Sequence, residues 1–138
     1  MNDKRMITVD SFEITELELG MYVTKKMLEC GFDVSRSGFK YIREILSLML
    51  AEPDAKKPMC VYYKQVASDG SSVAKIDKAV GAAIEMSLAC GGLKALDEFM
   101  CGAISRKHTT ASVLCALKEY IRYSLYMNRN RSDAAIKN

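Results

Sequence analysis

The chain has 138 residues, a formal net charge of +3 and a hydrophobic fraction of 49%. This length allows one compact domain with its own core, and no apolar run is long enough to cross a membrane. The charge is too small to indicate a nucleic-acid partner by itself, although residues 1–20 are acidic and the remainder is correspondingly more basic. Because no apolar signal-peptide core opens the chain, we expect a cytoplasmic protein.

The five cysteines are scattered, odd in number and free of any Cys-x-x-Cys pair. We therefore expect neither disulfides nor a metal, but small buried side chains in a reducing cytoplasm. Nine methionines, two prolines and no tryptophan are typical of a helix-rich core. No cofactor is expected.

Residues 1–14 lack helical periodicity and are predicted to be a loose acidic leader, with a short strand at residues 6–9 as the alternative. Thr15 and Glu18 fit a capping box, which predicts a helix up to Gly31. A second helix is predicted to end before a proline. Its apolar face consists of Phe39, Ile42, Ile45, Leu46 and Met49.

A short helix at residues 61–67, a tight polar turn and a long helix at residues 71–89 are predicted next. Lys75 and Lys78 lie three apart, opposite the apolar stripe of the long helix. That stripe consists of Val73, Ile76, Val80, Ala83 and Ile84. Two helices joined by a sharp turn, the second apolar inside and basic outside, are typical of a helix-turn-helix.

A short helix at residues 93–100 and a last helix capped by Thr109 or Thr110 complete the prediction. The last helix has an apolar stripe formed by Val113, Leu114, Leu117, Ile121 and Leu125. The polar residues 128–138 are predicted to be a flexible tail. The sequence thus predicts an all-α domain at residues 15–127, a compact bundle of about six helices that contains a helix-turn-helix.

Binding is the chemistry that this pattern favours. Lys75 and Lys78 would project together toward a groove or phosphates, and Ser71 and Ser72 stand at a helix start, where unpaired N–H groups favour an anion. Asp77 lies between the lysines and favours the alternative of a solvated face without a ligand.

Catalysis is not expected, because no set of residues offers a nucleophile, a base and a stabilising group together. His108 has no ligand-type neighbour at a useful spacing, and we expect it to be solvated before the last helix. Basic residues of the C-terminal third either contact phosphates or only solubilise the surface. They are Arg106, Lys107, Arg122, Arg129 and Arg131.

Residues 24–49 (TKKMLECGFDVSRSGFKYIREILSLM) resemble the opening helices of the C-terminal effector domain of the sporulation master response regulator, the stage-zero sporulation protein A family. Gly31 and the run Gly38-Phe39-Lys40-Tyr41-Ile42-Arg43-Glu44 carry this similarity. Residues 71–85 (SSVAKIDKAVGAAIE) resemble the recognition helix of the family. With Thr109 at the family's capping threonine, the resemblance covers residues 24–127.

The resemblance implies a helical domain, sequence-specific binding of double-stranded DNA and transcriptional control in a spore-forming type of bacterium. Lys75 and Lys78 stand where the family has arginines on its recognition helix, and Asp77 stands where it has a glutamate. The helix at residues 71–89 would enter the major groove, bound as a homodimer or in tandem. Residues expected to fix the register on the DNA backbone are Ser71, Ser72, Lys64 and Gln65.

Three departures from the family pattern bear on DNA binding, and an alternative function is favoured by the depleted face at Gly81 and Ala82, the small net charge and the acidic leader. Gly81 and Ala82 replace a basic residue and a histidine, the turn is about one residue shorter, and the leader is too short for a receiver domain. The alternative is a protein-interaction module that pairs with a regulator, through its last helix, without reading DNA.

Overall fold

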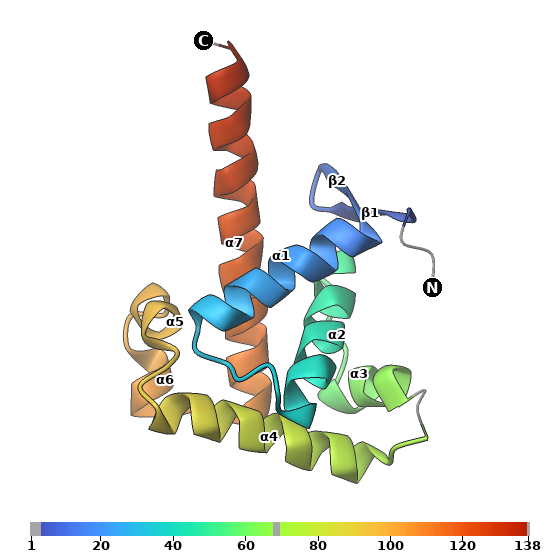
Figure 1. The fold of residues 1–138 in the computed structure, drawn as a ribbon, viewed down its shortest axis with the longest axis vertical. Helices are drawn as coiled ribbons and strands as arrows, with labels where there is room; N and C mark the ends of the chain where they lie inside the picture. The colour runs from blue at the N-terminus through green and yellow to red at the C-terminus, as the bar shows by residue number, and fades with distance from the viewer. Residues whose placement is uncertain (1–3, 68–69, 138) are drawn as a thin grey trace.

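The computed structural model describes residues 4–67 and 70–137 and is mostly helical, with a small two-stranded hairpin (Figure 1). The elements are β1 (Met6–Val9), β2 (Phe12–Thr15), α1 (Glu16–Glu29), α2 (Ser37–Ala51), α3 (Met59–Val66), α4 (Val73–Ala89), α5 (Lys94–Phe99), α6 (Ala103–Arg106) and α7 (Thr110–Lys137). The predicted helical character is confirmed, with seven helices in these residues instead of about six. None of the described helices has the length and apolar character needed to cross a membrane.

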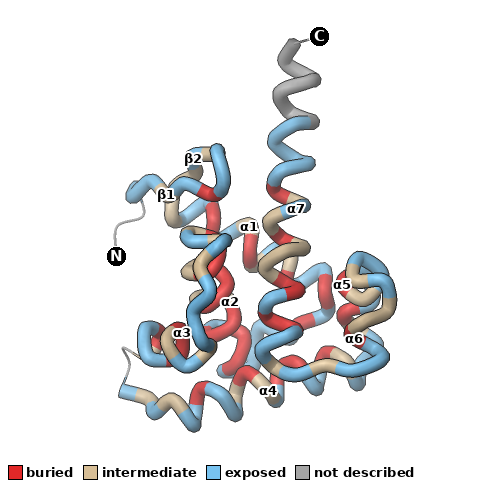
Figure 2. The backbone as a smooth tube through the Cα atoms, turned by 180° about the vertical axis from the view of Figure 1, so that it is seen from behind, coloured by how far each residue is buried: buried red, intermediate tan, exposed pale blue. Residues whose placement is uncertain are grey.

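The core lies around α2, which packs against α1, α3, α4 and α7. Figure 2 shows buried segments along α2 and along the part of α7 that passes beside it. Every member of the predicted apolar stripes on these two helices is buried: Phe39, Ile42, Ile45, Leu46, Met49, Val113, Leu114, Leu117, Ile121 and Leu125. The helical period in the sequence therefore identified the inward faces correctly.

A close crossing between α2 and α4 positions the candidate site. Gly38 lies in the first turn of α2, where a Cβ atom would come 2.3 Å from the carbonyl oxygen of Ala79 and 2.8 Å from the Cβ of Ala83. Both separations are too short for a side chain. The two helices approach this closely because residue 38 is a glycine.

The other end of α4 is fastened to α1. The carbonyl oxygen of Cys30 accepts hydrogen bonds from Ser87 Oγ at 3.0 Å and from the backbone N–H of Leu93 at 2.9 Å. A Cβ atom on Gly92 would lie 2.4 Å from Ser87 Oγ, so this junction also requires a glycine. Gly31, with φ +83°, ends α1 as predicted.

The leader predicted at residues 1–14 is in its described part an antiparallel hairpin, with Val9 of β1 opposite Phe12 of β2. The alternative of a short strand is confirmed as β1, and its partner strand β2 was not predicted. Asp10 occupies the turn with φ 56°. Its carboxylate accepts hydrogen bonds from Arg122 Nε at 2.9 and 3.0 Å, which fastens the hairpin to α7.

The C-terminal third differs from the prediction at two points. α6 was not predicted, and Asp97 Oδ1 accepts a hydrogen bond from the N–H of Ser105 within it at 3.0 Å, which lowers the pKa of Asp97. α7 continues to Lys137, so residues 128–137 are helical instead of a flexible tail (Figure 1). The predicted cap is confirmed, because Thr109 Oγ1 accepts a hydrogen bond from the N–H of Ser112 at 3.1 Å.

The cysteines are less buried than expected. All five are free thiols, but only Cys30 is buried, and burial raises its pKa to about 11. The remaining four, Cys60, Cys90, Cys101 and Cys115, are exposed. The expectation of buried cysteines is therefore wrong for these four, which stand on the outer sides or at the ends of helices.

The α2–α4 crossing leads to a stability prediction. Gly38→Ala should lower the free energy of unfolding by about 1–3 kcal/mol, because the new methyl group meets the backbone of α4. Gly20→Ala in α1 is the matched control, since no atom lies within 4 Å of its added Cβ and the helix gains up to about 1 kcal/mol. Urea unfolding of both variants measures the difference. Equal stability of the two variants would contradict the close crossing.

Candidate nucleic-acid interface

The predicted binding surface lies on two consecutive helices, α3 and α4, at the edge of the fold (Figure 1). Both helices begin and end within two residues of their predicted bounds. Ser72 caps α4, because its Oγ accepts a hydrogen bond from the backbone N–H of Lys75 at 3.1 Å. Residues 68 and 69 of the predicted turn lie outside the described residues.

A hydrogen bond fixes α3 against α4. The hydroxyl of the buried Tyr63 donates to Asp77 Oδ1 at 2.9 Å. Burial of the phenol, followed by this hydrogen bond, raises the pKa of Tyr63 well above its usual value. The tyrosine therefore stays a neutral donor. Asp77, which was expected to read DNA beside the lysines, is engaged with the neighbouring helix.

A second hydrogen bond connects the start of α4 to α2. The hydroxyl of Tyr41 and Ser71 Oγ lie 3.0 Å apart. Because Ser72 caps the helix, both serines that were expected to contact phosphates hold the beginning of α4 in place. Their backbone N–H groups belong to the helix start, where the dipole of α4 is positive.

Six of the seven predicted contact residues are exposed, among them Ser72 and Asp77, and only Ser71 is half-buried. Lys64 and Gln65 lie on α3, and Lys75 and Lys78 lie on α4. None of these three lysines forms an ion pair with another described residue. By contrast, Ile76 on the opposite side of α4 is fully buried. The first two turns of α4 therefore present two ammonium groups that form no ion pair with a described carboxylate, although the exposed Asp77 lies between them in sequence.

The second half of this face is not basic. Ala82 is exposed, and Glu85 follows one turn later. Glu85 Oε1 lies 2.9 Å from Nε2 of His108, so this partly exposed histidine, expected to be solvated, also has a side-chain partner. The hydrogen bond to Glu85 is the main cause that raises the pKa of His108. The outer face of α4 thus changes from basic to mixed charge along its length.

The basic residues of the C-terminal third are largely engaged within the chain. Arg122 binds carboxylates of three segments, namely Asp10, Asp54 and Glu119. Arg106 Nη1 donates to a backbone carbonyl at 3.1 Å, and the guanidinium of Arg129 lies 5.2 Å from the centre of a hairpin aromatic ring. Lys107 is exposed, whereas the side chain of Arg131 lies outside the described part. This end of the chain offers fewer cations to a ligand than its composition indicates.

The hydrogen bonds of Tyr41 and Tyr63 were not predicted from the sequence. The hydroxyl of a buried tyrosine usually finds a hydrogen-bond partner, so two tyrosines near predicted core positions indicated such contacts. The partners could not be named, since Ser71 and Asp77 lie 30 and 14 residues away in sequence. Only the packing of three helices brings these pairs together.

Within the described residues, no three His, Cys, Asp or Glu side chains converge in a way that could hold a metal ion. No protein-family model, no curated protein and no solved structure matches the chain. The resemblance carried by residues 24–127 therefore stays a prediction from the residues.

The bond between α3 and α4 is testable by a double-mutant cycle. Tyr63→Phe and Asp77→Ala should each destabilise the fold, with a coupling of about 1 kcal/mol between them, because each removes one partner of the same hydrogen bond. Tyr62→Phe is the control, since its hydroxyl bonds no described group and the change should be nearly neutral. Urea unfolding gives all four corners of the cycle, and additive effects would show that the bond does not contribute.

His108 is the only histidine, so its proton NMR signals report one site. We expect it to titrate above the ordinary pKa of 6.5 and to shift down in Glu85→Gln. A raised pKa means that the pair stabilises the fold fully below pH 6.5, and that this stabilisation disappears as the pH rises through the folded-state value. An unshifted pKa in the wild type, or no change in Glu85→Gln, would disprove the contact.

Proposed function

We propose that this chain is a sequence-specific DNA-binding transcription regulator whose α4 helix enters the major groove. Its α3, the following turn and α4 act as a helix-turn-helix. An α-helix about 10–12 Å across fits a major groove about 12 Å wide. The support is the exposed, unpaired lysine pair at the start of α4, together with the resemblance to the effector domain of the sporulation regulator.

The orientation of Asp77 is the observation that carries the proposal. In sequence, an acid between two bases favours a neutral, solvated face. Because the Asp77 carboxylate accepts a hydrogen bond from Tyr63, it is directed to the flank beside α3. Lys75 and Lys78 are exposed without a carboxylate partner among the described residues. A phosphate or a guanine edge is a suitable ligand for two such ammonium groups.

Other residues have supporting roles in this proposal. Lys64 and Gln65 on α3, with the N–H groups at Ser71 and Ser72, fix the register on the DNA backbone. Asp77 sets the angle between α3 and α4 without touching DNA. One module with two lysines buries a small interface, so specific binding requires two copies, as a homodimer or in tandem. Such a regulator would act in the cytoplasm.

A protein-interaction module is the second candidate. It is favoured by the outer face of α4 beyond Lys78, where Ala82 and Glu85 provide no cation for DNA. Such a module would bind a regulator protein through apolar side chains. Salt separates the two functions, because phosphate contacts release counterions and lose affinity steeply as salt rises, whereas apolar contacts do not.

A gel shift on duplexes selected from a random pool tests the DNA-binding face. Lys75→Ala should weaken specific binding by about 1–3 kcal/mol, and Lys75→Ala with Lys78→Ala should abolish discrimination between duplexes. Lys56→Ala with Lys94→Ala is the matched control, since it removes the same charge from other segments. Its affinity should remain close to that of the wild type.

Two outcomes would reject the proposal. Unchanged binding by the Lys75→Ala, Lys78→Ala protein would show that α4 is not the reading helix. Binding that is insensitive to salt would favour the protein-interaction module.

A further inference from the structure

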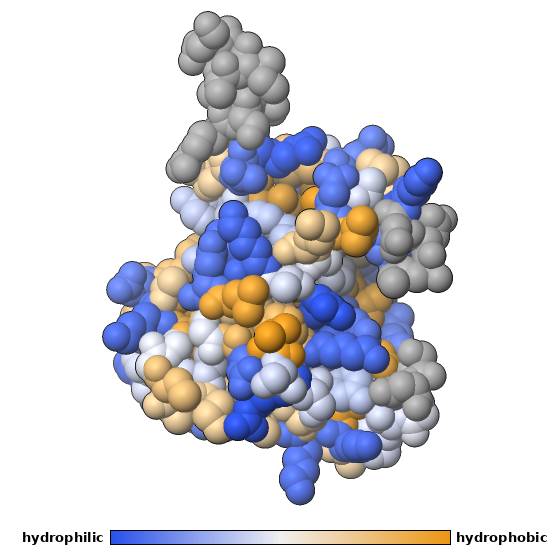
Figure 3. Space-filling view, viewed as in Figure 1, coloured by the Kyte–Doolittle hydropathy of each residue, from blue (hydrophilic) through white to orange (hydrophobic). Residues whose placement is uncertain are grey.

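The outward face of α1 carries a stripe of exposed apolar side chains. Leu17, Met21 and Leu28 are 51%, 64% and 51% exposed, and their spacings of four and seven residues place them on one side of the helix. Large side chains of this kind are normally scattered singly over a surface. Figure 3 shows exposed hydrophobic side chains gathered on the face over α1.

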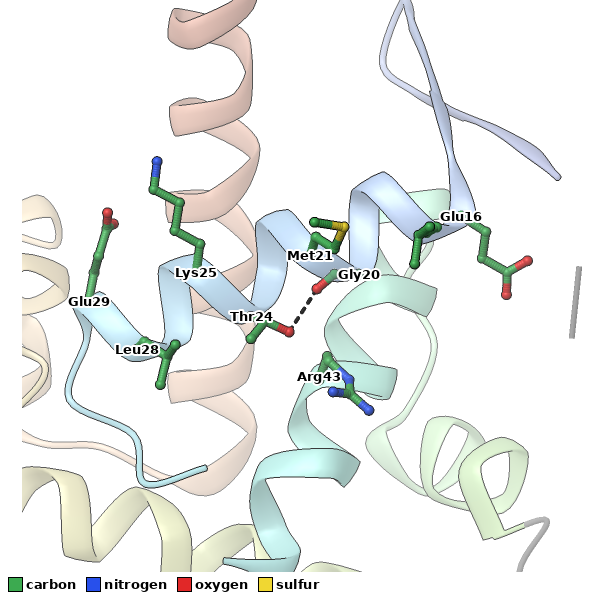
Figure 4. A pocket seen from close by; sticks show the side chains of 9 residues that line it. Glu16, Gly20, Met21, Thr24, Lys25, Leu28, Glu29 and Arg43 are labelled. Atoms are coloured by element: carbon green, nitrogen blue, oxygen red, sulfur yellow. Dashed lines mark hydrogen bonds between the residues drawn. The ribbon is translucent and has the colours of Figure 1, made fainter. Parts of the chain in front are cut away.

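The stripe lines a groove of about 820 Å³ between α1 and the neighbouring surface of α2. The middle of the groove is open at Gly20, because no atom of a neighbouring element lies within 4 Å of the position that a Cβ would take there. Thr24 Oγ1 donates to the carbonyl oxygen of Gly20 at 2.8 Å, so its hydroxyl is already satisfied (Figure 4). The groove is therefore open, apolar along its length and able to accept another helix closely.

Two cations border this apolar stripe on opposite sides. Figure 4 shows Lys25 extending from one side of α1 and Arg43, which comes from α2, on the other. Neither side chain forms an ion pair or a hydrogen bond with another described residue. The lining acids Glu16 and Glu29 lie toward the two ends of α1. The middle of the groove is thus positively charged on both sides.

We propose that this groove binds an amphipathic helix of a partner protein, whose apolar stripe is flanked on both sides by carboxylates. Leu17, Met21 and Leu28 would take the apolar stripe, as grooves that bind helices generally do. Lys25 and Arg43 would pair with the flanking Asp or Glu side chains, which gives orientation and selectivity. The groove is formed by α1 and α2, away from the outer face of α4. The inference is therefore independent of DNA binding.

Selection from a displayed library of randomised helices of about 16 residues, with the full chain as bait, tests this inference. We expect enriched helices to combine an apolar stripe with Asp or Glu on both flanks. Amide chemical shifts of the labelled protein should change along α1 and at Arg43 when a selected peptide is added. Affinity should fall at least about tenfold in Lys25→Glu with Arg43→Glu.

Two further variants complete the test. Gly20→Leu fills the groove without changing any charge and should also block the selected peptide. This variant tests the groove even if the charge variant fails to fold. Lys56→Glu with Lys94→Glu carries the same charge change elsewhere and should bind normally. The inference is overturned if no helix is enriched, if enriched helices lack flanking carboxylates, or if the shifts lie outside the groove. DNA binding by the wild type is measured separately, so either proposal can fail alone.

Discussion

The crossing of α2 over α4 is the contact on which the candidate interface depends. Gly38 has no side chain, so the first turn of α2 lies directly against the backbone of Ala79. Buried Ile76, Val80 and Ile84 then face the core, and the opposite side of α4 is left toward solvent. Two tyrosine hydrogen bonds, from Tyr41 to the beginning of α4 and from Tyr63 to its second turn, hold the helix at this angle. Any change in the crossing would therefore redirect the lysines.

Attachments at both ends make α4 a rigid element, which is what a reading helix requires. Its N-terminal end is held by the two tyrosines and its C-terminal end by the Cys30 carbonyl, which Ser87 and Leu93 share. Elsewhere in the fold, Arg122 of α7 forms ion pairs with Asp10 of the hairpin and with Asp54 in the linker after α2. These ion pairs join the hairpin and the linker to α7. Arg106 and Arg122, which sequence alone would assign to a ligand, thus serve the fold.

The helical period and capping residues predicted α1, α2, α4 and α7, because these features act within a few residues of one another. The hairpin was missed as a pair of strands because its turn at Asp10 contains no glycine, and α6 is too short to show a period. Within the site, the exposure of Lys75 and Lys78 followed from spacing. The engagement of Asp77 by Tyr63 did not, since it depends on how α3 packs on α4. DNA binding itself remains a prediction.

This small fold has two proposed binding surfaces: a basic helix face for DNA and an apolar groove on α1 for a partner helix. The first of these is central, and methylation interference on a selected duplex tests it most directly. Methylation of guanine N7 blocks the major groove, and methylation of adenine N3 blocks the minor groove. If α4 enters the major groove, modified guanine N7 positions should prevent binding. Interference at adenine N3 alone, or none at either position, would contradict a major-groove role for α4.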